Sequence, residues 1–186
     1  MNDFYEIINK YPNHGALGGR QGDTGLEQNR YELNELCKFI TENEIKSWLE
    51  IGIAHGYLLR FMQTEMKLRT LGVTLPEYTH AHGGLTVMYG SSRRLEIINA
   101  VQSYVNEHGK FDMIFVDGDH SYEGVKADYL NYKHLCKYMG FHDACGLRHC
   151  EGVPRFLSEI KDLYKDSYRL FEDQTDFRSG IVTIKL

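Results

Sequence analysis

The chain has 186 residues, which predicts one domain with a full hydrophobic core, because a chain of this length buries about 70% of its extended surface. Hydrophobic residues make up 42% of the sequence and charged residues 25%, a composition that excludes disorder. The net charge of −5 provides no overall attraction to nucleic acid or anionic lipid. We therefore expect a single domain over residues 1–186 and no nucleic-acid partner.

The location of the protein is predicted from the absence of a membrane-spanning segment and of a signal peptide in this sequence. Apolar runs stay well short of the ~20 residues that span a bilayer, and the first residues, MNDFYEIINKYPNHG, lack the apolar core of a signal peptide. Four irregularly spaced cysteines are typical of reduced thiols rather than of a disulfide framework. These features predict a cytoplasmic protein without a membrane partner, and they leave homo-oligomerisation open.

Residues 1–30 are expected to form an N-terminal arm or lid within the domain, since 11–27 are rich in Gly, Asn and Asp. Helical and strand patterns then alternate along the chain. Helices are expected over 28–44, 57–65, 93–107, 123–138 and from 152 onward, and strands over 47–51, 68–75, 85–89, 111–116, 139–144 (truncated) and 180–186. This alternation predicts an α/β fold with a mostly parallel sheet and a ligand crevice at the carboxyl ends of the strands.

The first candidate site lies in SWLEIGIAHGYLLRFM, residues 47–62, where Glu50, Gly52 and Gly56 span a strand-to-helix turn. Glycine lets the backbone approach a ligand closely, and the helix that follows offers free N–H groups at its positive end. The spacing matches neither the dinucleotide GxGxxG nor a P-loop. By itself such a turn is equally compatible with a purely structural role.

The second candidate site is FVDGDHSYEG, residues 115–124, directly behind a buried strand. Charged groups in that position must be solvated, paired or bound to a ligand, because an unpaired buried charge is costly. Ser121 and Glu123 are expected to cap the helix that follows. Asp119 could either cap that helix or contribute to a site with Asp117 and His120.

Together these segments resemble a known family. ExGxxxG on the first strand, FDMIFVDGDHSYEGVKADY and then FHD are similar to the class I S-adenosylmethionine-dependent methyltransferases, in particular the small-molecule O-methyltransferase branch (cephalosporin-hydroxylase-like and catechol-type). The resemblance extends over residues 33–186. It implies a Rossmann-like doubly wound sheet with an antiparallel last strand and helices on both faces. It also implies S-adenosylmethionine above Gly52 and Gly56, with Glu50 orienting its amino-acid part.

Two positions depart from the family pattern. Thr74 stands where the family usually has an acid at the end of the second strand. Ser91 stands where the family often has the acid of a Gly-Asp-Ser run after the third strand. We expect both to bind the cofactor, although a hydroxyl lacks the charge-assisted strength of a carboxylate. With the short fifth strand, they keep an alternative open: a catalytically degenerate methyltransferase-fold binding or regulatory protein.

The resemblance further implies a divalent cation on Asp117, His142 and Asp143, with Asp117 also beside the cofactor. Mg²⁺ suits the carboxylate oxygens and would lower the pKa of a bound hydroxyl. His120 stands in the place of the family's catalytic lysine, and its unperturbed pKa near 6.5 suits a proton acceptor. The implied reaction is methyl transfer to a hydroxyl of a small-molecule acceptor, a sugar or a natural product.

Other polar groups admit simpler interpretations. HDACGLRHC, residues 142–150, has donors that suit zinc, but it lacks Cys-x-x-Cys, and one short loop does not easily provide four tetrahedral ligands. His80 and His82 are expected at a flexible rim of the pocket. Arg93 and Arg94, at the start of a helix, are expected to be solvated.

Overall fold

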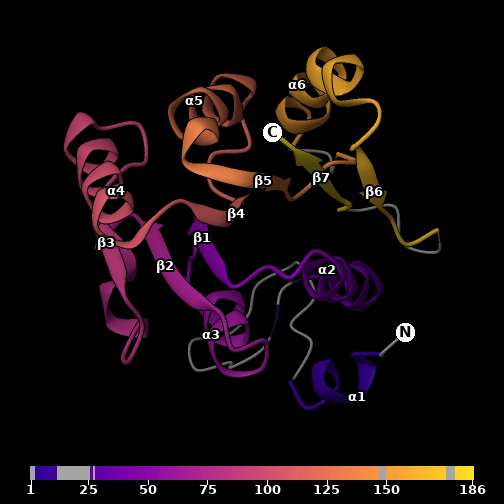
Figure 1. The fold of residues 1–186 in the computed structure, drawn as a ribbon, viewed down its shortest axis with the longest axis horizontal. Helices are drawn as coiled ribbons and strands as arrows, with labels where there is room; N and C mark the ends of the chain where they lie inside the picture. Colours follow the sequence, from indigo (N-terminus) through magenta and orange to yellow (C-terminus); the bar gives the residue numbers. More distant parts are fainter. Residues whose placement is uncertain (1–2, 12–25, 27, 147–149, 175–178) are drawn as a thin grey trace.

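The computed structural model describes residues 3–11, 26, 28–146, 150–174 and 179–186. A seven-stranded sheet with the order β3-β2-β1-β4-β5-β7-β6 organises the chain (Figure 1). The strands are β1 (Ser47–Ile51), β2 (Arg69–Thr74), β3 (Val87–Tyr89), β4 (Phe111–Val116), β5 (Cys136–Phe141), β6 (Arg169–Phe171) and β7 (Ile181–Lys185). The helices are α1 (Tyr5–Ile8), α2 (Arg30–Glu42), α3 (Tyr57–Thr64), α4 (Leu95–His108), α5 (Tyr122–Tyr132) and α6 (Gly152–Ile160), with 3-10 turns η1 (Pro76–Ala81), η2 (Lys133–Leu135) and η3 (Lys161–Tyr164).

Strands β1 to β5 run parallel, whereas β7 is antiparallel to both β5 and β6. The register places Ile51 beside both Val73 and Val116, so the carboxyl ends of β1, β2 and β4 lie at one edge of the sheet. Val116 in turn pairs with Phe141 at the end of β5. The predicted Rossmann-like doubly wound fold with an antiparallel last strand is confirmed.

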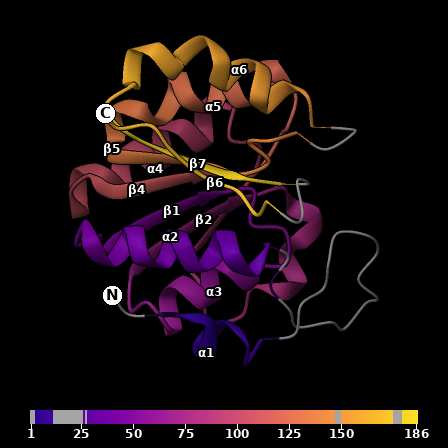
Figure 2. The same ribbon diagram turned by 90° about the vertical axis from the view of Figure 1, so that its right-hand side faces the viewer.

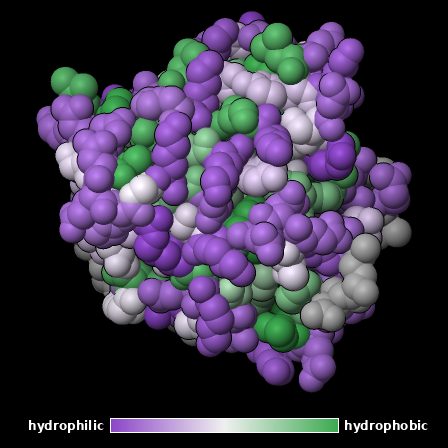
Figure 3. All heavy atoms as spheres, in the orientation of Figure 1, coloured by the Kyte–Doolittle hydropathy of each residue, from purple (hydrophilic) through white to green (hydrophobic). Residues whose placement is uncertain are grey.

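Helices cover both faces of the sheet, with α1, α2 and α3 on one side and α4, α5 and α6 on the other (Figures 1 and 2). Strand alternation divides the core accordingly: Trp48 of β1 packs with the first group, and Leu49 with the second. The molecular face shown in Figure 3 is mainly hydrophilic, with small, separate apolar patches. No described helix is long and apolar enough to cross a membrane.

The structure corrects the expectation for the fifth strand. Helix α5 ends at Tyr132, one 3-10 turn follows, and β5 begins at Cys136 rather than at residue 139. The helical spacing of apolar residues continues past Tyr132, but backbone pairing with β4 on one side and β7 on the other determines the conformation. The strand spans six residues and is not truncated, which removes one of the grounds for a degenerate methyltransferase. The short elements α1, η1 and β6 were not predicted.

Gly52 is required by the packing of the protein itself. Its φ is +90°, and a Cβ at this position would lie 2.2 Å from the carbonyl oxygen of Asp117 and 2.4 Å from the Cα of Gly118. The residue therefore allows the loop after β1 to lie directly against the loop after β4. That contact keeps the two predicted site segments together.

We expect Gly52→Ala to lower the free energy of unfolding by at least about 2 kcal/mol, because the new methyl group must displace backbone and the positive φ is strained. Chemical denaturation of the ligand-free protein measures this. Gly83→Ala is the matched control, since a Cβ at Gly83 meets nothing within 4 Å. Equal stability of the two variants would contradict this account of the contact.

Candidate active site

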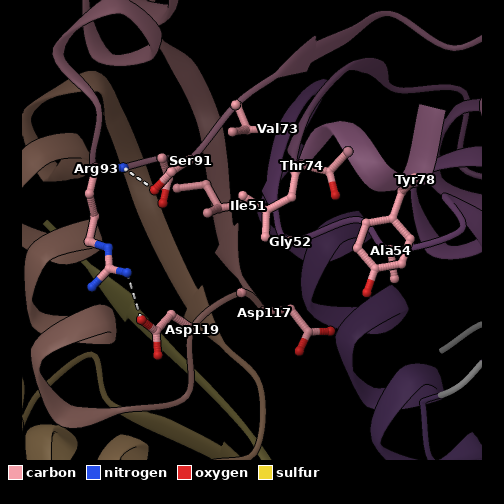
Figure 4. A pocket seen from close by; sticks show the side chains of 14 residues that line it. Ile51, Gly52, Ala54, Val73, Thr74, Tyr78, Ser91, Arg93, Asp117 and Asp119 are labelled. Carbon is pink, nitrogen blue, oxygen red and sulfur yellow. Dashed lines mark hydrogen bonds and ion pairs between the residues drawn. The ribbon is translucent and has the colours of Figure 1, made fainter.

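A pocket of about 350 Å³ opens at the carboxyl edge of the sheet, between the loops that follow β1, β2, β3 and β4 (Figure 4). We call it the main pocket. Four predicted cofactor residues line it: Gly52, Thr74, Ser91 and Asp117. Thr74 is buried in the pocket wall, and Ser91 lies half-buried in the loop after β3. Segments far apart in the sequence thus form one concave surface.

The other two predicted cofactor residues lie elsewhere. Glu50 is buried and lines a small side cavity that shares Gly52, Ala54 and Asp117 with the main pocket. Its carboxylate accepts a hydrogen bond of 3.3 Å from the indole N–H of Trp48. Gly56 is not among the residues that line either cavity. It precedes α3 with φ +77°, and a Cβ there would lie 2.9 Å from the side chain of His82.

Tyr78 and an ion pair are features of the main pocket that the sequence did not reveal. The ring of Tyr78, from η1, lies beside Ala54 on one side of the pocket, and Arg93 lies on the opposite side (Figure 4). The Arg93 Nη2 atom is 3.0 Å from Asp119 Oδ2, and both side chains are part-exposed. Arg93 is therefore paired at the pocket wall rather than simply solvated. No spacing rule in the sequence predicts such a contact between two separate loops.

His82 is not a flexible rim residue, contrary to the expectation. It is 4% exposed, with Nε2 2.7 Å from the carbonyl oxygen of Ala54 and Nδ1 3.2 Å from the hydroxyl of Tyr89. Ala54 has a left-handed φ of +42°, which is costly for a residue with a Cβ. His82 thus helps to hold the turn after β1 in its conformation. The side chain of His80 lies outside the part of the structure that is described.

Behind the main pocket lies a buried carboxylate that the sequence analysis missed. Asp128 is 1% exposed and accepts a hydrogen bond of 2.6 Å from the hydroxyl of Ser92, a pocket residue. Its second oxygen, Oδ2, has no hydrogen-bond partner within the described part of the chain. Burial raises the pKa of Asp128 to about 6, although Ser92 and Arg93 lower it. The wall that contains Ser91 and Ser92 thus has a carboxylate directly behind it.

Next to the main pocket, Asp117, His120, His142 and Asp143 form a compact group that we call the His–Asp cluster. Asp117 Oδ1 is 3.3 Å from His120 Nε2 and 3.1 Å from His142 Nδ1. Asp143 Oδ2 is 3.1 Å from His120 Nδ1 and 3.6 Å from His142 Nδ1. The cluster therefore joins the loop after β4 to the end of β5, as parallel strands with adjacent carboxyl ends allow.

Charge pairing governs the cluster. Burial opposes ionisation of Asp117, but His142 and His120 hold its pKa down, to about 2. The hydrogen bond to Asp117 raises the pKa of His120. Burial alone would lower the pKa of His142, yet Asp117 and Asp143 raise it well above 6.5. The carboxylates of the cluster thus favour the protonated form of both imidazoles in the metal-free protein.

The donor atoms of this cluster fit a divalent cation. Asp117, His142 and Asp143, the three predicted ligands, each offer an atom within 4.8 Å of the others. His142 faces both carboxylates with Nδ1, and an imidazole nitrogen with two carboxylate oxygens is a donor set that divalent metal ions accept. His149, which the alternative zinc motif included, lies outside the described residues.

A family model described as a methyltransferase domain matches residues 49–143, just over half of the chain. The chain belongs to the methyltransferase domain family. The matched segment begins in β1 and ends at Asp143, so it includes the turn with Gly52 and the whole His–Asp cluster. The resemblance inferred from the sequence is thereby confirmed. No curated protein matches the chain in sequence.

Solved structures of O-methyltransferases share the fold. A Staphylococcus aureus protein assigned as a caffeoyl-CoA O-methyltransferase has a TM-score of 0.58 and 18% identity over 100% of this chain and 93% of its own. A Bacillus cereus O-methyltransferase in complex with S-adenosylhomocysteine (SAH) has a TM-score of 0.58 and 14% identity, with coverages of 98% and 90%. The MycE methyltransferase, in complex with Mg and SAH, has a TM-score of 0.59 and 14% identity, with coverages of 80% and 48%. At these identities the similarity concerns the fold.

The charge pairing predicts how stability depends on pH. The unfolded histidines release their protons near 6.5, whereas His120 and His142 retain theirs in the folded protein. The free energy of unfolding of the metal-free protein should therefore fall as pH rises from about 6.5 through the raised pKa values, by at most about 1.4 kcal/mol per pH unit for each histidine. Below pH 6.5 this contribution is complete.

Urea denaturation at a series of pH values measures this slope. Asp117→Asn should reduce it, since the carboxylate that stabilises both imidazolium groups is lost. Asp119→Asn is the matched control and should retain it, because Asp119 pairs mainly with Arg93. Identical slopes in the two variants would show that Asp117 does not determine the protonation of the histidines.

Proposed function

We propose that this protein is an S-adenosylmethionine-dependent methyltransferase that transfers a methyl group to a hydroxyl of a small molecule. The observation that carries the proposal is the position of the His–Asp cluster. The cluster borders a pocket of cofactor size in a methyltransferase domain, and Asp117 belongs to both the cluster and the pocket. A methyl donor in the pocket and a hydroxyl at the cluster would be neighbours, and positioning of this kind supplies much of the rate of a group transfer.

The cofactor would lie across the main pocket and the side cavity. Thr74 and Ser91 line the wall where the family's acids would contact the adenosine part, and Tyr78 offers an aromatic face there. Glu50 and Gln28 line the side cavity, where polar groups suit the amino-acid end. In complexes with known structures, the fold neighbours from Bacillus cereus and the mycinamycin pathway hold SAH.

The acceptor would approach His120 from outside the pocket. His120 also lines an outer hollow of about 420 Å³, together with Tyr122, Glu123, Glu151 and Arg155. This lining is polar and charged with one aromatic ring, which favours a hydroxylated acceptor such as a sugar or a polar natural product. His120 would accept the proton of the attacking hydroxyl, and Asp117 would orient its ring through Nε2.

A divalent cation on Asp117, His142 and Asp143 would polarise an acceptor hydroxyl and lower its pKa. Mg²⁺ is one candidate, because two of the three ligands are carboxylates. A single domain over residues 1–186, a cytoplasmic location and self-association belong to the same proposal.

A second candidate function is a catalytically degenerate methyltransferase-fold protein that binds or regulates. Thr74 and Ser91 favour it, because both replace charged cofactor contacts of the family. The full-length β5 and the complete His–Asp cluster argue for the enzyme instead, since two part-buried histidines between two carboxylates are an arrangement typical of a functional site.

Cofactor binding is tested by calorimetric titration with SAH. We expect binding to wild type, and Ser91→Trp should weaken it at least about tenfold, or 1.4 kcal/mol, because the indole fills the pocket. Ser103→Trp, on the exposed surface of α4, is the matched control and should bind as wild type does. Absence of SAH binding by the well-folded wild type would overturn the enzyme proposal and favour the degenerate protein.

The role of His120 is tested by SAH release in the presence of a panel of hydroxylated acceptors. His120→Ala should lower the rate of methyl transfer roughly 100- to 10,000-fold, the usual value of general base catalysis. Its SAH affinity should stay within about threefold of wild type, because His120 is not among the residues that line the main pocket. An unchanged rate would show that another group accepts the proton.

A further inference from the structure

His120 faces two different sets of partners with its two ring nitrogens. Nε2 points to Asp117, whereas Nδ1 lies 3.1 Å from Asp143 Oδ2 and 3.2 Å from the Sγ atom of Cys150. The donor atoms of His120, Asp143 and Cys150 all lie within 4.8 Å of one another. They come from three segments: the loop after β4, the end of β5 and the loop before α6. We call this group the thiol triad.

We propose that the thiol triad is a binding site for a borderline transition-metal ion such as Zn²⁺, and that an ion bound there occupies the nitrogen through which His120 would otherwise exchange protons. The second half of this statement rests on the function proposed above, in which His120 is the base. The site shares Asp143 with the Asp117, His142 and Asp143 group, so an ion in the triad would also compete with a cation there.

The donor types select the ion. Zn²⁺ is bound by thiolate, imidazole and carboxylate, and sites with three protein ligands leave the fourth tetrahedral position to water. Mg²⁺ takes oxygen ligands in octahedral geometry and avoids sulfur. The triad should therefore bind Zn²⁺ in preference to Mg²⁺, a preference that the adjacent carboxylates alone would not provide.

The spacing of the donors is close to what zinc requires. Tetrahedral zinc with its usual bond lengths holds neighbouring ligand atoms about 3.3 to 3.6 Å apart. The observed separations of 3.1 and 3.2 Å from His120 Nδ1 are within a few tenths of an ångström of these values. Small side-chain rotations are sufficient to open the triad around an ion.

The triad is both anchored and accessible. The Asp143 side chain is only 7% exposed, whereas the His120 side chain is 31% exposed and Cys150 is half-buried. The objection that one loop cannot supply enough ligands does not hold here, because His120 precedes Cys150 by 30 residues. The proposed zinc ligands thus differ from those that residues 142–150 alone suggest, because His120 joins Asp143 and Cys150 from outside that segment.

Cobalt is the appropriate probe, because a thiolate bound to Co²⁺ gives an intense near-ultraviolet charge-transfer band that carboxylate and imidazole ligands do not give. We expect this band when Co²⁺ is added to the metal-free protein, and Zn²⁺ should displace it. Cys150→Ser should abolish the band and weaken Zn²⁺ binding at least tenfold. Cys145→Ser, a half-buried cysteine outside the triad, is the matched control and should retain both.

Nuclear magnetic resonance tests the effect on His120 directly. The His120 ring signals should stop shifting with pH once Zn²⁺ is bound to wild type, and should continue to shift in Cys150→Ser. A missing thiolate band in wild type, a band that persists in Cys150→Ser, or continued titration of His120 with bound Zn²⁺ would each overturn the proposal. SAH titration of the zinc-free protein separates the two proposals. SAH binding without the band overturns only the triad, whereas the band without SAH binding overturns the methyltransferase function and leaves the triad as an ion site.

Discussion

The carboxylate of Asp117, whose side chain is only 14% exposed, is the constraint on which the site depends. Oδ1 is shared by His120 and His142, Oδ2 lies 3.4 Å from the side-chain nitrogen of Gln28, and the backbone oxygen occupies the space beside Gly52. A charge at this depth is stable only when it is paired. One residue at the end of β4 thereby determines the positions of the turn after β1, the exit of β5 and the segment that precedes α2.

The same charge explains why the cluster suits both protons and cations. In the metal-free protein the two carboxylates favour protonation of the two histidines, as the raised pKa values of His120 and His142 indicate. A divalent cation requires the same lone pairs, so metal and protons must compete for the cluster. Because Asp117 also lines the main pocket, whatever occupies the cluster would act on the group that is bound beside it. A methyl transfer to a hydroxyl uses this arrangement directly.

The sequence predicted those parts of the structure that depend on local pattern. The expected bounds of β1 and β4 are those observed. The motif at residues 115–124 directed attention to Asp117 and His120, which lie within 3.3 Å of each other. The predicted start of β5 was wrong, because backbone pairing with the neighbouring strands outweighed the helical spacing of the apolar residues. The Arg93–Asp119 pair, the contact of His82 with Ala54 and the carboxylate of Asp128 behind Ser92 join segments that only the folded chain brings together.

A crystal structure of the protein with SAH tests the central claim most directly, since it shows both the site and the orientation of the ligand. The account predicts the adenosine part in the main pocket against Thr74, Ser91 and the ring of Tyr78, with the amino-acid end toward Glu50. The sulfur should then face the His–Asp cluster. SAH bound at any other place, or with its sulfur directed away from Asp117 and His120, would contradict the proposed arrangement of donor and acceptor.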